Sequence, residues 1–565
     1  MRIRPILCAL AAVGAATAVG GIAATGSPAQ NGDVRTYVVL LDPAASTDQA
    51  TQSIQAAGGT IERINTAVGV ATVRSTDDDF AARAANQPAI QGTATDRSIG
   101  QIPAGSRTKQ ERDQIERLQD QRTASRGDQA VTPNAATPGE PLASLQWDMQ
   151  MMHATVAGSY REQQGTRDVR VGIMDTGVDG SHPDIAPNFD SELSRNFTVD
   201  DPVIDGACDT DPDGSCADPA NVDENGHGTH VAGTIAAPLN GLGMAGVAPR
   251  ADIVNLRAGQ DSGYFFIQPV VDALTYAGDH GIDVVNMSFY IDPWLYNCAA
   301  NPADTPEQQQ EQRTIVEATQ RALDYAHNRG VTLVAAAGNE NTDLGRPSFD
   351  PTSPDYPDAA AAHDRNVDNS CLSMPTEGNG VIGVTSVGPS GRKAYYSNYG
   401  TEQADVSAPG GDYRDYPGTP RYATPQNLIL APYPEALARA SGDVDAAGVP
   451  TTPFVVADTQ NGRTAYYQYL QGTSMAAPHV VGVAALIVSQ YGKPDRSQGG
   501  LTLPADRVQA LLQKTATDTP CPNPRQYEYP GLAAKYNAYC EGPPKRNGFF
   551  GDGVVDALAA IHARD

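Results

Sequence analysis

Hydrophobic positions in most of the chain fall into short continuous runs that alternate with segments of helical length. After about residue 144, these runs cover 169–174, 253–256, 284–289, 331–336 and 381–387. The segments between them, such as 265–278 and 308–328, are long enough for helices. Continuous apolar strands that alternate with helices are typical of a mostly parallel sheet covered by helices on both faces. We therefore predict an α/β fold for residues 144–565.

The N-terminal part of the chain has a different pattern. Within residues 34–103, apolar runs predict short strands and mixed segments predict two helices; the strands are 36–41, 60–64 and 68–73, and the helices are 48–57 and 77–86. This mixture predicts a small separate α+β domain. Residues 104–143 contain a charged stretch, 106–121, and then a segment rich in Pro, Ala and Thr. We interpret them as a linker whose charged part is a solvated helix or has no fixed structure.

The first 29 residues have the pattern of an export signal. Arg2 and Arg4 precede an apolar run over 6–19, and Ser27-Pro28-Ala29 ends in a small residue. This pattern predicts a signal peptide over 1–29, and the short apolar run disfavours the alternative of a membrane anchor. We expect a secreted, extracellular protein without a membrane segment once the signal is removed.

The net charge and the cysteines narrow the picture. A formal net charge of −27 over 565 residues argues against nucleic-acid binding and suits a soluble protein. Six cysteines follow the signal, and in an exported chain they predict disulfides with fifteen possible pairings. Sequence proximity favours Cys208–Cys216 and Cys521–Cys540, which leaves Cys298–Cys371. Free or metal-binding thiols are the alternative, although no Cys-x-x-Cys pair supports a zinc site.

Four polar residues stand at positions where catalytic groups are expected. In parallel sheets, functional groups gather beyond the carboxyl ends of the strands. Asp175 follows the first predicted strand in GIMDTGVDGSHPDI, and Asn339 follows the fourth in VAAAGNE. His227 precedes a predicted buried helix in NGHGTHVAGTIAA, and Ser474 heads the apolar segment GTSMAAPHVVGVAALIVS. A carboxylate, an imidazole and a hydroxyl can form a nucleophilic triad, and an Asn amide can donate to an oxyanion.

Three of these residues also have a structural interpretation. Ser474 suits a helix N-cap, and Asp175 and Asn339 suit turns. Asp-Thr-Gly at 175 also resembles the aspartic-protease motif, but the chain has no matching second copy and its α/β pattern disagrees. His227 and His230 are three residues apart and lack the Glu of the His-Glu-x-x-His zinc motif. We therefore expect no metal there and a structural role for His230.

Together, the four segments resemble the signature segments of the subtilisin-like serine proteases, the subtilases. The order Asp175, His227, Ser474 is the order of that family, and the resemblance covers about Ser144 to Ile561. It implies a serine endopeptidase in which Ser474 attacks the scissile carbonyl, His227 transfers the proton and Asp175 orients the imidazole. Asn339 and the backbone N–H of Ser474 would form the oxyanion hole.

The resemblance extends more weakly to the N-terminal domain. Residues 34–103 resemble the family's inhibitory propeptide, for which a ferredoxin-like fold is expected. The protein would then be a zymogen that processes itself, with its own propeptide as an intramolecular inhibitor.

Substrate is expected to bind as an added strand along two exposed backbone edges. By resemblance, these edges are Ser262-Gly263-Tyr264 and Ser288-Phe289-Tyr290. Tyr290 stands where the family has Gly, so we expect a narrowed or reshaped primary pocket. A second departure is the long segment 411–469, which either rims the cleft or lies elsewhere on the surface.

The proposed chemistry requires no cofactor, but calcium is a separate question. Subtilases often bind calcium, which takes oxygen ligands, and residues 201–224 are densely acidic. Their spacing does not match an EF-hand loop. A structural calcium ion is therefore an open alternative to which we assign no ligands.

The sequence leaves three functions to compare. We expect a monomeric endopeptidase that acts on polypeptide substrates. A dedicated processing protease with narrow specificity is the first alternative, which Tyr290 favours. A non-catalytic binding protein on the same fold is the second, and the presence of all three triad residues and Asn339 argues against it.

Overall fold

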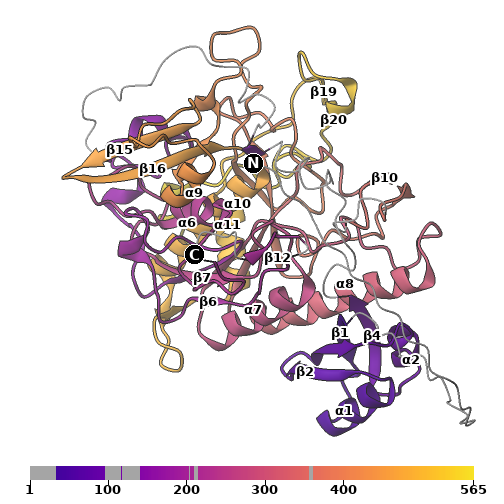
Figure 1. The fold of residues 1–565 in the computed structure, drawn as a ribbon. Helices are drawn as coiled ribbons and strands as arrows, with labels where there is room; N and C mark the ends of the chain where they lie inside the picture. The colour runs from indigo at the N-terminus through magenta and orange to yellow at the C-terminus, as the bar shows by residue number, and fades with distance from the viewer. Residues whose placement is uncertain are drawn as a thin grey trace, which may run out of the picture.

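The computed structural model describes residues 34–95, 116–117, 140–202, 204–208, 214–355 and 361–564. Its main body is built around a seven-stranded sheet, and a small N-terminal unit lies beside it (Figure 1). The interpretation of residues 1–29 as a signal peptide falls outside the described residues, as does most of the linker 104–143.

All neighbouring strands of the large sheet are parallel, which confirms the predicted fold class. The strand order is β13-β12-β9-β8-β5-β7-β6. In chain order the strands are β5 (Arg170–Met174), β6 (Arg195–Asn196), β7 (Asp252–Arg257), β8 (Val284–Met287), β9 (Thr332–Ala336), β12 (Val381–Val387) and β13 (Val406–Pro409). The five predicted apolar runs correspond to β5, β7, β8, β9 and β12, although β8 ends before Ser288 and Phe289.

Helices bury their apolar side chains in two cores, one for each face of the sheet. The first core contains α6 (His227–Ala236), α10 (Thr473–Tyr491), α11 (Ala505–Thr515) and α12 (Ala557–Ile561). The second contains α7 (Ile267–Asp279) and α8 (Pro306–His327). Helix α10 is long and apolar enough to span a bilayer, but 89% of its apolar window is buried inside the fold. A helix that is buried on all sides needs no polar face, so α10 is a central core helix.

The N-terminal unit is a four-stranded antiparallel sheet with two helices, and its order β2-β3-β1-β4 is ferredoxin-like. Its elements are β1 (Arg35–Leu41), α1 (Thr47–Ala56), β2 (Thr60–Asn65), β3 (Val70–Ser75), α2 (Phe80–Ala84) and β4 (Ile90–Thr95). The sequence did not predict β4, because Ile-Gln-Gly-Thr-Ala-Thr contains no apolar run.

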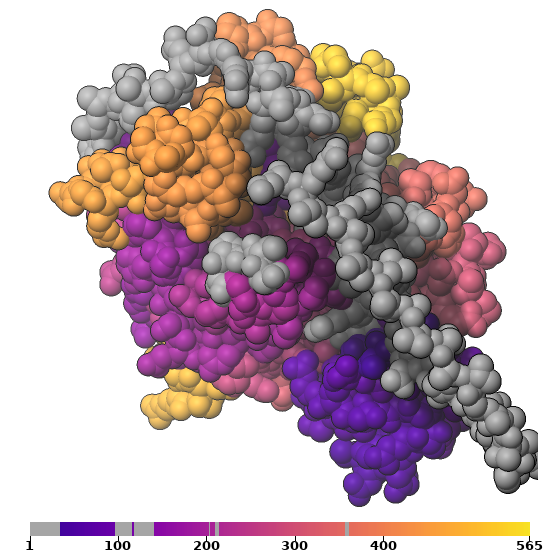
Figure 2. Space-filling model, in the orientation of Figure 1, coloured from indigo at the N-terminus to yellow at the C-terminus, as the bar shows by residue number. Residues whose placement is uncertain are grey.

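This unit packs against α8 of the main body, as Figures 1 and 2 show. Arg321 of α8 donates to the carbonyl oxygens of Leu41 and Val68 at 2.9 and 3.4 Å. Glu311 of α8 accepts a hydrogen bond from the backbone N–H of Thr95 at 3.0 Å. Backbone groups at strand ends and in a turn of the small sheet are thus satisfied by side chains of the main body.

The segment 411–469 packs against α6, and none of its residues is among those that line the cavity beside Ser474. It contains a three-stranded sheet and one helix, β14 (Ile429–Pro432), α9 (Glu435–Ala440), β15 (Val455–Gln460) and β16 (Arg463–Leu470). The ring nitrogen Nε2 of His230 in α6 lies 3.1 Å from the carbonyl oxygens of both Ile429 and Gln468. This contact agrees with the structural role expected for His230.

Shorter elements connect these parts. They are α5 (Trp147–Met151), β10 (Phe349–Asp350), β11 (Arg365–Asn366), β17 (Lys493–Pro494), β18 (Leu501–Thr502), β19 (Gln526–Tyr527) and β20 (Ala538–Tyr539).

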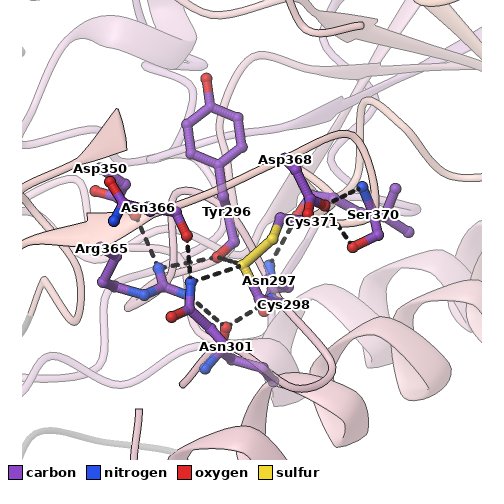
Figure 3. Close-up of a disulfide and its surroundings, with 12 residues drawn as sticks. Tyr296, Asn297, Cys298, Asn301, Asp350, Arg365, Asn366, Asp368, Ser370 and Cys371 are labelled. Carbon is purple, nitrogen blue, oxygen red and sulfur yellow. Dashed lines mark hydrogen bonds and ion pairs between the residues drawn. A yellow bond between two sulfur atoms is a disulfide. The ribbon is translucent and has the colours of Figure 1, made fainter. Parts of the chain in front are cut away.

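The six cysteines after the signal form the three disulfides favoured by sequence proximity. The pairs are Cys208–Cys216, Cys298–Cys371 and Cys521–Cys540. Cys298–Cys371 joins the segment after β8 to the segment before β12, across 73 residues of sequence (Figure 3). Backbone hydrogen bonds between Asn297 and Leu372, at 2.8 and 2.9 Å, join the same two segments, so these bonds and the disulfide together fix their relative position.

Candidate active site

Asp175 directly follows β5, at the carboxyl end of that strand. The residue is completely buried. Its Oδ1 atom accepts a hydrogen bond from the backbone N–H of Thr176 at 2.8 Å and lies 2.7 Å from Nδ1 of His227. A buried carboxylate in this contact fixes which nitrogen of the imidazole carries the proton, and it leaves Nε2 free to face the cleft.

His227 begins α6, and the turn before it brings the imidazole to Asp175. Gly226, with φ of 89°, forms the N-cap. Asp223 accepts hydrogen bonds from the backbone N–H groups of Gly226 and Thr229 at 2.8 and 2.9 Å. Gly228 allows α6 to approach β5 closely, because a Cβ atom there would lie 2.1 Å from the carbonyl oxygen of Gly177. These contacts explain why glycines flank His227 in the sequence.

Ser474 lies in the first turn of α10 and is 5% exposed. The N-cap of α10 is Gly472, and the hydroxyl of Ser474 makes no capping hydrogen bond. The N-cap interpretation of Ser474 is therefore wrong. Its Oγ atom donates instead to Oε1 of Glu116 at 2.7 Å.

Asn339 follows β9 and turns its amide nitrogen towards the same point. Its Oδ1 atom accepts from the backbone N–H of Thr473 at 2.9 Å and from the Thr473 hydroxyl at 3.0 Å. Its Nδ2 atom donates to Oε1 of Glu116 at 3.1 Å. The amide is held in the orientation that an oxyanion donor requires.

Glu116, from the predicted linker, brings these residues together. One carboxylate oxygen accepts from both Ser474 and Asn339, and the other lies 3.5 Å from Nε2 of His227. The adjacent Arg117 donates to the backbone oxygen and to Oδ1 of Asn225 at 2.8 and 2.9 Å. No sequence pattern points to this contact, since Glu116 is one of many charged residues in the stretch 106–121.

The two carboxylates around His227 change its protonation. Burial by itself would lower the pKa of His227, but the charge and the hydrogen bond of Asp175 outweigh it. Together with the charge of Glu116, they raise the pKa to about 9. At neutral pH the imidazole is thus a cation between two carboxylates. A protonated imidazole cannot accept a proton from Ser474, so this arrangement is catalytically closed.

Ser474, His227 and Asn339 line a cavity, and most of the predicted substrate-binding residues line it as well. Its lining includes Gly263, Ser288, Phe289 and Tyr290, together with His227, Asn339 and Ser474. The Phe289 ring stacks on Phe265, with ring centroids 4.1 Å apart. Ser262 and Tyr264 are not among the lining residues: the N–H of Ser262 donates to Asp205, and the carbonyl oxygen of Tyr264 accepts from Gln260.

Tyr290 forms one wall of this cavity. Its hydroxyl donates to Oδ2 of the buried Asp355 at 2.9 Å. The ring is thereby tied to the protein instead of projecting freely into the cavity. Tyr290 therefore gives this part of the cavity a wall of fixed geometry.

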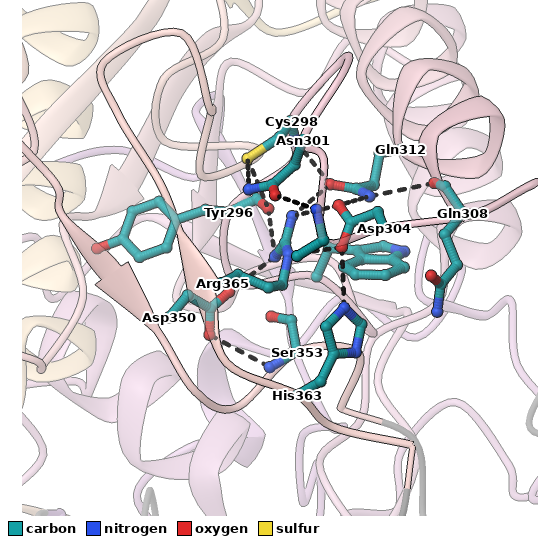
Figure 4. A network of polar contacts seen from close by, with 12 residues as sticks. Tyr296, Cys298, Asn301, Asp304, Gln308, Gln312, Asp350, Ser353, His363 and Arg365 are labelled. Carbon is teal, nitrogen blue, oxygen red and sulfur yellow. Dashed lines mark hydrogen bonds and ion pairs between the residues drawn. The ribbon is translucent and has the colours of Figure 1, made fainter. Parts of the chain in front are cut away.

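A buried polar network supports the cavity wall that Leu295 and Ser373 line. Arg365 is fully buried, donates to both oxygens of Asp304 at 3.0 Å, and donates to Asp350 at 2.9 Å (Figure 4). The Cys298–Cys371 disulfide lies beside it (Figure 3). Because Asp304 and Arg365 come from the two segments that this disulfide joins, network and disulfide stabilise the same wall.

The acidic segment 201–224 contributes Asp218 to a cluster with Asp200 and Asp261. Among the described residues, these form the only group of three or more acidic, His or Cys side chains whose ligand atoms all lie within 4.8 Å of one another. Arg257 is buried among them and forms ion pairs with all three. The guanidinium of Arg257 already supplies the positive charge among these carboxylates, so with Arg257 in place the cluster does not fit a calcium ion.

Comparisons with known proteins agree with this geometry. A model of the subtilase family matches residues 166–538. Thermitase from Thermoactinomyces vulgaris is 29% identical over 374 residues, which cover 66% of this chain and 92% of thermitase. A thermophilic serine proteinase from Bacillus sp. strain AK1 is 30% identical over 346 residues, 61% of this chain and 58% of that protein. The epidermin leader peptide processing serine protease of Staphylococcus aureus shares the fold, with a TM-score of 0.60, 21% identity, and coverage of 94% of this chain and 98% of its own.

Proposed function

Because the chain belongs to the subtilase family of serine peptidases, we propose that Asp175, His227 and Ser474 act as its catalytic triad. The protein hydrolyses peptide bonds in polypeptide substrates, and Asn339 stabilises the oxyanion. The observation that carries the proposal is the convergence at one point: Ser474 and Asn339 donate to the same oxygen, beside the imidazole that Asp175 holds.

The geometry supports the following sequence of steps. Once the cleft is open and His227 is neutral, Nε2 accepts the proton of Ser474 as Oγ attacks the scissile carbonyl carbon. The carbonyl oxygen becomes an oxyanion at the position of Oε1 of Glu116, where it accepts from Nδ2 of Asn339. The imidazolium, stabilised by Asp175, then gives its proton to the leaving amine. Water attacks the acyl-enzyme by the same route and regenerates Ser474.

We propose that the protein with Glu116 bound in the cleft, as in this structure, is an inactive precursor. Glu116 occupies the position of the oxyanion, takes the hydrogen bond of Ser474 and favours the protonated form of His227. The N-terminal unit on α8 anchors the segment that precedes the linker. Cleavage of the linker 104–143 after Glu116 would separate this residue from the catalytic domain and open the site, so that 34–103 acts as an intramolecular inhibitor until then.

A narrow processing specificity is the second candidate. The fixed Tyr290 wall restricts the cavity, which favours selection among substrates. The Staphylococcus aureus neighbour is named for processing a leader peptide, and at 21% identity that likeness adds the fold alone. Cleavage profiles of a randomised peptide library separate the candidates: cuts after many residue types support a general endopeptidase, and one dominant motif supports a processing enzyme.

The remaining parts of the proposal concern where and how the enzyme works. We propose export by the signal over 1–29 and a monomeric mature enzyme whose chemistry needs no cofactor. A structural calcium ion, if it binds, binds elsewhere than among the carboxylates around Arg257.

The direct test of the proposed function is Ser474→Ala. The variant should be secreted without peptidase activity and with its N-terminal unit attached. Normal activity or maturation of the purified variant, with no other protease present, would refute the proposal.

A further inference from the structure

Asn398 is a buried residue that contacts the backbone on both sides of the proposed oxyanion donor. It lies between β12 and β13 and is 2% exposed. It is not among the residues that line the cavity, so it does not reach the reacting atoms. All of its side-chain hydrogen bonds that the structure gives go to the segment 337–342, which carries Asn339 at its centre.

These hydrogen bonds use every donor and acceptor group of the Asn398 amide. Nδ2 donates to the carbonyl oxygen of Ala337 at 3.0 Å and to the carboxylate of Glu340 at 2.6 Å. Oδ1 accepts from the backbone N–H groups of Glu340 and Thr342 at 3.1 and 2.8 Å. The backbone N–H of Asn398 adds a bond to the carbonyl oxygen of Gly338 at 2.9 Å. One side chain thus fixes the backbone before and after Asn339.

The segment needs such support because it leaves the sheet at Gly338. Gly338 has φ of 100°, and a Cβ atom there would lie 2.4 Å from Nδ2 of Asn398. The backbone therefore lies directly against the Asn398 amide. The N–H of Ala337 makes the last hydrogen bond of this segment to β12, at 3.0 Å from the carbonyl oxygen of Val384. Polar groups after Ala337 need other partners, and buried polar groups left without partners are costly. Asn supplies two donors and an acceptor within one short side chain, which neither Asp nor Leu does.

We propose that Asn398 is the positioning residue of the oxyanion hole, which it serves by holding Asn339 in place. This inference rests on the proposed function. Thr473 fixes the side chain of Asn339 from one side, and Asn398 fixes its backbone from the other. An oxyanion donor acts only within a narrow range of distances, and a displacement of about 1 Å can cost about 10²-fold in rate.

The test is a double-mutant cycle between Asn398→Ala and Asn339→Ala, with kcat and KM measured on a chromogenic peptide. The concentration of active enzyme is measured by titration with a serine-directed phosphonate, so that unfolded protein is excluded from the calculation of kcat. We expect Asn398→Ala to lower kcat about 10- to 100-fold with KM changed less than about 3-fold. In the Asn339→Ala background, the same substitution should change kcat less than about 3-fold.

Asn188→Ala is the matched control. The Asn188 amide is equally buried, at 2% exposure, and donates to the carbonyl oxygens of Ala236 and Pro249 at 2.7 and 2.8 Å. Its loss should lower the melting temperature and leave kcat of the folded enzyme unchanged. Asn398→Asp serves if the Ala variant does not fold, because it keeps the acceptor and loses both amide donors.

Three outcomes decide the matter. Coupling of Asn398 to Asn339 supports the positioning role. If Asn398→Ala lowers kcat equally in the unchanged enzyme and in Asn339→Ala, or lowers only the melting temperature, the positioning role is overturned and the proposed function stays intact. An Asn339→Ala variant with unchanged kcat overturns the oxyanion assignment and the positioning role together.

Discussion

Replacement of Glu116 by Ala should activate the uncleaved precursor. The carboxylate accepts hydrogen bonds from Ser474 at 2.7 Å and from Asn339 at 3.1 Å, and it lies 3.5 Å from Nε2 of His227. Hydrogen bonds to a charged group contribute about 1.5–3 kcal/mol each, so the two together hold the closed state by at least about 3 kcal/mol. At about 1.4 kcal/mol for each factor of ten, their loss should raise the open fraction about 100-fold.

The assay follows the reaction of Ser474 with a fluorescent phosphonate. Freshly refolded precursor is mixed with the probe, and the labelled bands are separated by size, so that precursor and mature enzyme are scored separately. The labelling rate of the precursor band should rise about 100-fold in Glu116→Ala and less in Glu116→Gln, which keeps an acceptor but loses the charge.

Glu111→Ala is the matched control, because it removes an acidic residue from the same charged stretch. It should leave the labelling rate of the precursor unchanged. Equal rates for the unchanged precursor, Glu116→Ala and mature enzyme would refute the idea that this carboxylate closes the site.

Three further predictions concern pH, the disulfide and the buried arginine. Because the pKa of His227 is raised to about 9 in the closed state, that state is stabilised below this pH and destabilised as pH rises through it; labelling of the uncleaved precursor should therefore increase through about pH 9, and a flat profile would contradict the role of the imidazolium. Replacing Cys298 and Cys371 by Ser should lower the free energy of unfolding by about 4 kcal/mol in urea titrations, since the bond closes a 73-residue separation, and it should raise KM because the bond supports the cavity wall; an unchanged KM would separate the disulfide from the site. Arg257→Met should lower the free energy of unfolding by about 3–5 kcal/mol, and millimolar Ca²⁺ should restore more melting temperature in this variant than in the unchanged protein; equal shifts would show that Arg257 does not take the place of a cation.

The sequence was sufficient for the parts of the fold and site that continuous apolar runs and short motifs encode. Runs such as 331–336 and 381–387 predicted central strands because such strands are buried on both faces. Asp175 and Asn339 were found because they directly follow strands, and parallel strands place their carboxyl ends at one edge. Strand β4 was missed, since as an edge strand it carries polar residues and one glycine.

Contacts between residues that are far apart in the sequence and belong to no motif could not be predicted from the sequence. Glu116 lies 358 residues from Ser474, and no pattern distinguishes it from neighbouring charges. Arg257 lies in an apolar strand, and the three carboxylates around it come from separate segments. Asn398 has no sequence signal either, because its importance depends on the backbone that it contacts rather than on its own neighbours in sequence. Such roles follow from tertiary structure alone.

Mapping the site of covalent inhibition is the sharpest test of whether Ser474 is the nucleophile of a peptidase. The mature enzyme is treated with a serine-directed phosphonate until peptide hydrolysis stops, and the modified residue is located by tandem mass spectrometry. We predict one adduct, on Ser474, whose amount rises in proportion to the activity lost. Complete inhibition with the adduct on another residue, or full hydrolysis after quantitative labelling of Ser474, would contradict this assignment.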